Sequence, residues 1–208
     1  MSQMWPWLML AALGAFHGLN PAMGWLFAVA LGLHRGSRRV VWLSLLPIGL
    51  GHALSVAAVA FLFVLAGSVI DGPAVSIGAG VALIAWALYH WRFGARHRVR
   101  VGLQTGLMGL GLWSFLMATA HGAGLMLWPA LMPLCFPSGE ATSGRDALLS
   151  AALGVGVHTL AIVAVTATIA IAVYEWIGLE ILRRAWINLD AIWALALVTA
   201  GLCLLFVA

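Results

Sequence analysis

Long apolar segments dominate this sequence and restrict the folds that it can adopt. A helix needs about 20 apolar residues to cross the hydrocarbon core of a membrane, and in lipid every backbone polar group must be satisfied within the protein. Six segments are long enough: Met4–Leu33, Val41–Gly67, Ala74–Trp91, Leu103–Leu134, Ala147–Tyr174 and Ala185–Val207. Only 8% of the 208 residues are charged, against roughly 25% in soluble domains. The sequence therefore predicts an all-α integral membrane protein with six transmembrane helices.

The arginines predict how these helices are oriented. All ten basic residues are arginines, and nine of them follow the first segment, follow the third, or precede the sixth: Arg35, Arg38, Arg39, Arg92, Arg96, Arg98, Arg100, Arg183 and Arg184. Only Arg145 lies in the opposite loops. Basic loops stay in the cytoplasm, so we expect a multi-pass protein of the bacterial cytoplasmic (inner) membrane with both termini outside. The arginines fall in short clusters between apolar segments, which is the pattern of a topology signal, so no nucleic-acid partner is expected.

Helix breakers interrupt the first and fourth segments, each of which is about 30 residues long. The stretch HGLNPAMGW, residues 17–25, places Gly18 and Pro21 inside the first segment, and Gly122, Gly124 and Pro129 lie inside the fourth. Proline removes a helix hydrogen bond and clashes with the preceding turn, and broken helices inside membranes line protein cavities. We therefore predict that the first and fourth helices are broken.

An internal repeat relates the two halves of the chain. HALSVAAVA (52–60) matches HTLAIVAVT (158–166), and FHG (16–18) matches AHG (120–122), at offsets of 104 to 106 residues. Each half then holds three helices, and an odd number turns the second copy upside down. The sequence predicts inverted three-helix repeats at residues 1–100 and 101–208 that form one membrane domain. Inverted repeats and broken helices are typical of secondary transporters with sites near the membrane midplane.

Four histidines lie at equivalent positions of this repeat: His17, His52, His121 and His158. An imidazole inside the membrane is costly unless it faces protein, water or a metal, so these residues either bond across a helix interface or line a path. Neutral imidazole binds Ni, Co, Cu, Zn and Fe, and it also titrates near neutral pH. The four histidines are therefore compatible with a path for a metal ion and with a path for protons. Further candidates for the substrate path, from shared helix faces or nearness in sequence, are Asn20, Pro21, Met23, Ser55 and Met126.

One motif resembles a known family of metal transporters. The segment GLGHALSV (49–56) resembles the Gly-His-(Ser/Ala/Gly)-(Thr/Leu)-(Ser/Val)-Val segment of NiCoT/NicO-type nickel/cobalt transporters. These belong to the LysE-like superfamily, together with urease-accessory and TauE/SafE-like membrane proteins. One helix earlier the family carries His-Ala-x-Asp-Ala-Asp-His; here His17 matches the first histidine, Asn20 stands at the first aspartate, and Ala22 and Met23 replace the last two ligands. The resemblance implies a three-plus-three-helix scaffold and a transition-metal substrate.

Together these features predict a secondary transporter or permease for a transition-metal cation, which would be bound as substrate and not as a resident cofactor. Two alternatives stay open: a non-transporting membrane subunit of a larger complex, and a proton-coupled exporter of a small organic solute. The sequence has no ATP-binding Gly-x-x-x-x-Gly-Lys-Ser/Thr motif and no HExxH, and its Ser-Gly pairs fall in an external loop, so no enzyme is expected. The Gly-x-x-x-Gly pairs Gly14/Gly18, Gly32/Gly36 and Gly102/Gly106 allow packing within the chain or in a homodimer.

Overall fold

The structure is a computed structural model that describes residues 4–67, 69–70, 72–93, 106–137, 143–177 and 189–207. Throughout these residues the chain is helical or turning, with no strand, which confirms the all-α prediction. The helices are α1 (Trp5–Leu19), the 3-10 turn η1 (Pro21–Met23), α2 (Trp25–His34), α3 (Arg38–Gly67), α4 (Gly72–Phe93), α5 (Leu107–Ala120), α6 (Ala123–Met126), α7 (Trp128–Cys135), α8 (Gly144–Ala172), the π-helical turn η3 (Val173–Ile177) and α10 (Leu189–Val207).

Three of these helices are long and apolar enough to cross a membrane: Arg38–Gly67, Pro73–Phe93 and Gly144–Trp176. The outer face of α3 is compatible with a membrane. Leu46, Leu50 and Leu54 recur every fourth residue and are 63–64% exposed, so one whole stripe of the helix presents leucine to its surroundings. The other predicted segments contain shorter apolar helices, because two of them are broken and the start of the sixth lies outside the described residues.

The first predicted segment is broken at the expected place. Helix α1 ends at Leu19, and the Asn20 side chain accepts a hydrogen bond from the Ala22 amide (3.0 Å) to set up the turn η1. Pro21 occupies the first position of that turn, where a proline needs no amide hydrogen. Gly24, at φ 128°, then turns the chain into α2 with a backbone conformation that side chains with a Cβ rarely adopt. Gly18 itself stays inside α1.

The fourth predicted segment is broken twice. Helix α5 ends at Ala120, and Gly122 (φ 69°) starts the four-residue helix α6 in the left-handed conformation that glycine tolerates best. A second interruption at Leu127 separates α6 from α7. Pro129 lies in the first turn of α7, where proline fits a helix, so it marks a helix start and not the break itself.

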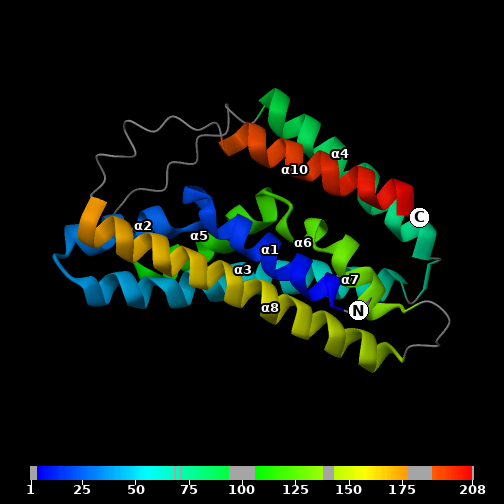
Figure 1. Cartoon of the computed structure of the whole chain (residues 1–208), viewed down its shortest axis with the longest axis horizontal. Coiled ribbons are helices and arrows are strands. Elements are labelled where there is room, and N and C mark those ends of the chain that lie inside the picture. Colours follow the sequence, from blue (N-terminus) through cyan, green and yellow to red (C-terminus); the bar gives the residue numbers. More distant parts are fainter. Residues whose placement is uncertain are drawn as a thin grey trace.

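The helices pack in pairs that join the two halves of the chain (Figure 1). Helix α1 packs along α8, α3 packs along both α5 and α8, and α4 packs along α10. Helices α4 and α10 cross where Gly80 and Gly201 face each other, so a Cβ on either glycine would lie within 2.8–2.9 Å of the carbonyl oxygen of the other. The N- and C-terminal ends lie at the same end of the molecule as the α3–α4 turn, opposite the α2–α3 connection.

Four of the nine arginines of the predicted cytoplasmic loops lie among the described residues. Arg35, Arg38 and Arg39 lie at the α2–α3 connection, and the Arg38 side chain pairs with Glu175 of η3 (Nε–Oε1 2.9 Å). Arg92 lies in the last turn of α4. The remaining arginines of the predicted cytoplasmic loops fall outside the described residues: Arg96, Arg98, Arg100, Arg183 and Arg184.

Candidate functional site

Three of the four repeat-related histidines meet in the middle of the helix packing. His17 comes from α1, His52 from α3 and His158 from α8, and their exposed fractions are 0%, 1% and 0%. The Nε2 atoms of His52 and His158 lie 3.2 Å apart. The centroid of the His17 ring lies 5.0 Å from that of His158 and 5.7 Å from that of His52. These three residues are called the histidine cluster below.

Backbone carbonyls determine which ring nitrogens carry hydrogens. The Nδ1 of His17 lies 2.7 Å from the Leu13 carbonyl oxygen, and the Nδ1 of His158 lies 3.2 Å from the Leu10 carbonyl oxygen. A carbonyl oxygen can only accept, so both Nδ1 atoms carry the hydrogen, and in neutral rings both Nε2 atoms carry a lone pair. The Nε2 of His52 must then donate to that of His158.

Two lone pairs of the histidine cluster have no hydrogen-bond partner among the residues that the structure describes. With the hydrogen of His52 on Nε2, its Nδ1 is an acceptor, and this atom and the Nε2 of His17 are both buried without a partner. Buried polar atoms normally find a partner, and an unpaired one calls for an explanation such as a bound ion. Among the described residues, no three His, Cys, Asp or Glu side chains stand in an arrangement that holds a metal ion directly.

The fourth predicted histidine lies apart from the cluster. His121 follows the last residue of α5, and its Nδ1 donates to the Met117 carbonyl oxygen at 2.9 Å. The ring of Trp193 from α10 contacts both sites, with its centroid 4.5 Å from that of His17 and 5.3 Å from that of His121. The predicted set of four thus divides into a cluster of three and a single histidine.

Tryptophan indoles satisfy the backbone carbonyls that both helix breaks leave without helical partners. Four indole Nε1 atoms donate to carbonyl oxygens there: Trp25 to Leu19 (3.1 Å), Trp113 to Ala22 (3.2 Å), Trp86 to Ala120 (2.7 Å) and Trp193 to His121 (2.9 Å). An indole suits this role because it brings a donor on a large apolar ring. These four tryptophans were not predicted as site residues; the available signal was a tryptophan inside a predicted apolar segment.

The other residues of the predicted path build the first helix break, bond between two helices, or are buried. Asn20 and Pro21 build the first break. Ser55 of α3 bonds to Thr119 of α5 (Oγ–Oγ1 2.8 Å), and Thr119 in turn donates to the Phe115 carbonyl oxygen at 2.9 Å. Met23 and Met126 are 1% and 3% exposed, and Met126 packs in the larger hydrophobic core.

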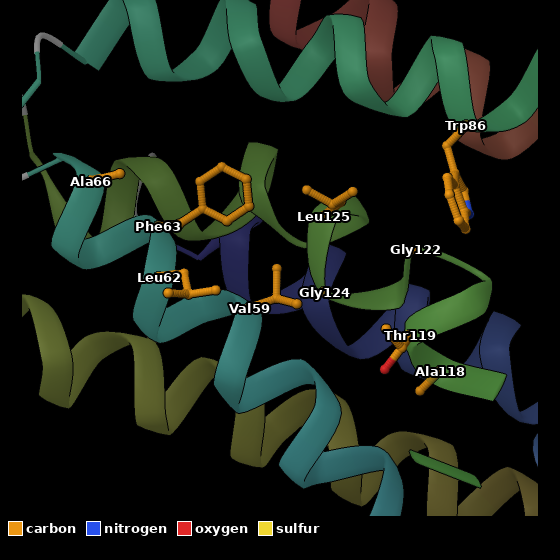
Figure 2. Close-up of a pocket in the computed structure, with 10 residues that line it drawn as sticks. All are labelled: Val59, Leu62, Phe63, Ala66, Trp86, Ala118, Thr119, Gly122, Gly124 and Leu125. Atoms are coloured by element: carbon orange, nitrogen blue, oxygen red, sulfur yellow. The ribbon is translucent and has the colours of Figure 1, made fainter. Parts of the chain in front are cut away.

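A groove of about 480 Å³ adjoins the second break (Figure 2). It lies between α4 and the helices α3, α5 and α6, with Trp86 on one side and Phe63 on the other. Apart from Thr119, the side chains that line it are apolar or an indole. The hydroxyl of Thr119 is already bonded to Ser55, so the groove offers a ligand little polar recognition.

Comparisons with known protein families, with curated proteins and with solved structures find no match to this chain.

Proposed function

We propose that the protein is a membrane secondary transporter for a transition-metal cation, built from two inverted three-helix repeats, with the histidine cluster as its ion-binding site. The observation that carries this proposal is the meeting of His52 and His158, which are equivalent in the repeat, at an Nε2–Nε2 distance of 3.2 Å. Two equivalent residues of an inverted repeat meet only at the two-fold axis between the halves. That axis is where inverted-repeat transporters build their sites.

The helix packing supports the inverted repeat. Under a two-fold exchange of the halves, α1 becomes α5 and α3 becomes α8, so the α1–α8 packing becomes the α5–α3 packing, and both occur. The α4–α10 packing maps onto itself, and the reciprocal approach of Gly80 and Gly201 fits an axis through that crossing. His17 and His121 also share one local bond, from Nδ1 to the carbonyl oxygen four residues earlier.

The tautomers of the cluster suit a metal. Histidines that bind metals usually donate the other ring N–H to a carbonyl or carboxylate, and His17 and His158 do this through Nδ1. If the His52 hydrogen moves from Nε2 to Nδ1, the two facing Nε2 atoms, 3.2 Å apart, both carry lone pairs. Two nitrogen ligands of a tetrahedral ion lie about 3.3–3.4 Å apart at metal–nitrogen distances of about 2.0–2.1 Å. The unpaired Nε2 of His17 supplies a third lone pair, and imidazole ligands suit Zn, Cu, Ni and Co.

The proposed topology has six spans in the bacterial cytoplasmic membrane, with the arginine-rich connections inside and both termini outside. In a chain with Cys203 replaced by alanine, we expect Val69→Cys, in the α3–α4 turn, to react with a membrane-impermeant maleimide on intact cells. Ser37→Cys, in the α2–α3 connection, should react only after the cells are permeabilised. The same side for both cysteines would contradict an odd number of spans between them.

The function is tested by ion flux into proteoliposomes that contain a metal-sensitive dye and, separately, a pH-sensitive dye. The panel is Ni(II), Co(II), Zn(II), Mn(II), Fe(II) and Cu(I). We expect saturable uptake of at least one ion that imidazole binds well, with Mn(II) among the poorest substrates because its affinity for nitrogen ligands is the lowest of the divalent series. No uptake of any ion by folded protein would overturn the proposal and favour an organic solute or a subunit role.

A further inference from the structure

Trp193 touches both the histidine cluster and the second helix break. Its side chain is 4% exposed, and its ring stands nearly perpendicular to that of His17, at an interplanar angle of 86° and a centroid distance of 4.5 Å. The same ring contacts His121 at a centroid distance of 5.3 Å, and Phe16 stacks against it at 5.5 Å. The rigid Trp193 side chain thus connects the His17 ring of the histidine cluster to the end of α5.

The polar end of Trp193 holds the backbone of the break. Its Nε1 donates to the carbonyl oxygen of His121 at 2.9 Å, immediately before Gly122, whose left-handed backbone starts α6. Gly122 also lines the groove beside α4. A movement of this indole therefore changes both the support of the break and the wall of that groove.

Trp86 can be compared with Trp193, because its indole also donates to a carbonyl oxygen at the second helix break. Its Nε1 donates to the neighbouring carbonyl oxygen, that of Ala120, at 2.7 Å. Its ring lies against Tyr89 and His90 on its own helix, at centroid distances of 5.7 and 5.3 Å. The two tryptophans thus support the same break, but the contact with His17 belongs to Trp193.

We propose that Trp193 is a positioning residue that couples ion binding at the histidine cluster to the second helix break, a step that rests on the proposed transport function. An ion that takes the lone pair of His17 changes the charge and orientation of that ring. The Trp193 indole, which packs against the His17 ring, must then change its position. Its Nε1 hydrogen bond transmits this movement to the His121 carbonyl oxygen. Coupling of this kind needs one element that both sites bias, and the break at His121–Gly122 is that element.

The test compares Trp193→Phe with Trp86→Phe in full-length protein reconstituted with Ni(II) or Co(II). Each variant loses one indole hydrogen bond to the second break. Because Trp193 is 4% exposed and Trp86 is 36% exposed, a thermal melt of both variants measures the loss of packing separately from the loss of transport rate. We expect Trp193→Phe to keep the wild-type dissociation constant within about threefold and to lower the maximal transport rate by about tenfold or more. Trp86→Phe should keep both quantities near the wild-type values.

Tryptophan fluorescence gives a second readout. Bound Ni(II) or Co(II) should quench the wild type and Trp86→Phe, and the quenching should shrink in Trp193→Phe because the indole beside His17 is gone. Equal losses of rate in the two variants, or a rate loss in Trp193→Phe matched by a loss of affinity, would overturn the coupling role. If the wild type itself neither binds nor moves any ion, the proposed function fails first, and this inference fails with it.

Discussion

Replacing His158 with asparagine is expected to abolish metal binding and transport while the protein still folds. The asparagine amide can still donate to the Leu10 carbonyl oxygen, as the Nδ1 of His158 does now, but nothing replaces the Nε2 lone pair that faces His52. Loss of a residue that merely supports a ligand costs 10–100-fold in metal affinity, so loss of a ligand should cost more than about 100-fold. The unpaired N–H of His52 should lower the free energy of unfolding by about 1–3 kcal/mol.

The prediction is checked by equilibrium dialysis with Ni(II) and Co(II), by flux in proteoliposomes, and by a thermal melt of the same samples. His34→Ala is the matched control, because this exposed histidine at the end of α2 lies outside the cluster and should leave all three quantities unchanged. The His52→Ala/His158→Ala double variant should show no flux at all. Wild-type affinity and flux in His158→Asn would mean that the cluster is a packing feature.

The second large effect is expected from Gly14→Ala, a change of one methyl group. Gly14 lies where α1 crosses α8, and a Cβ there would overlap the His158 carbonyl oxygen and come within 2.9 Å of the Ala161 Cβ. Backbone cannot move aside as a flexible side chain can, so the helices must separate. We expect a loss at the upper end of the roughly 1–3 kcal/mol typical of overpacked cores, a melting temperature lower by roughly 5–10 °C, and reduced transport because His17 and His158 move apart.

Gly156→Ala on the neighbouring helix controls for the substitution itself. No other part of the described chain lies within 4 Å of the place where its Cβ would be, and alanine is a better helix former than glycine by about 1 kcal/mol. The thermal melt should therefore show equal or greater stability and unchanged flux. Equal melting temperatures for Gly14→Ala and Gly156→Ala would contradict the close α1–α8 crossing.

The helix breaks could be predicted from the sequence because their causes are local. Pro21 cannot continue a helix hydrogen bond, and Gly24 and Gly122 adopt positive φ angles that favour glycine. Pro129 led to a less accurate prediction, since the same residue also suits a helix start.

The composition of the histidine site was predictable only in part. The repeat identified His17, His52 and His158, and it also included His121, which the structure separates from them. That separation depends on Trp193 of α10, more than 170 residues after His17 in the chain, and no local pattern reports where such a distant helix packs. The same holds for the indole caps of Trp86 and Trp113, which reach carbonyls 34 and 91 residues away.

The central claim is that imidazoles from both halves of the chain share one metal ion, and X-ray absorption spectroscopy of the purified protein loaded with one equivalent of Ni(II) or Co(II) tests it most directly. We expect nitrogen ligands at about 2.0–2.1 Å, multiple scattering from at least two imidazole rings, and loss of that scattering in His158→Asn. A bound ion coordinated by sulfur or only by oxygen, or a spectrum that His158→Asn leaves unchanged, would contradict the claim.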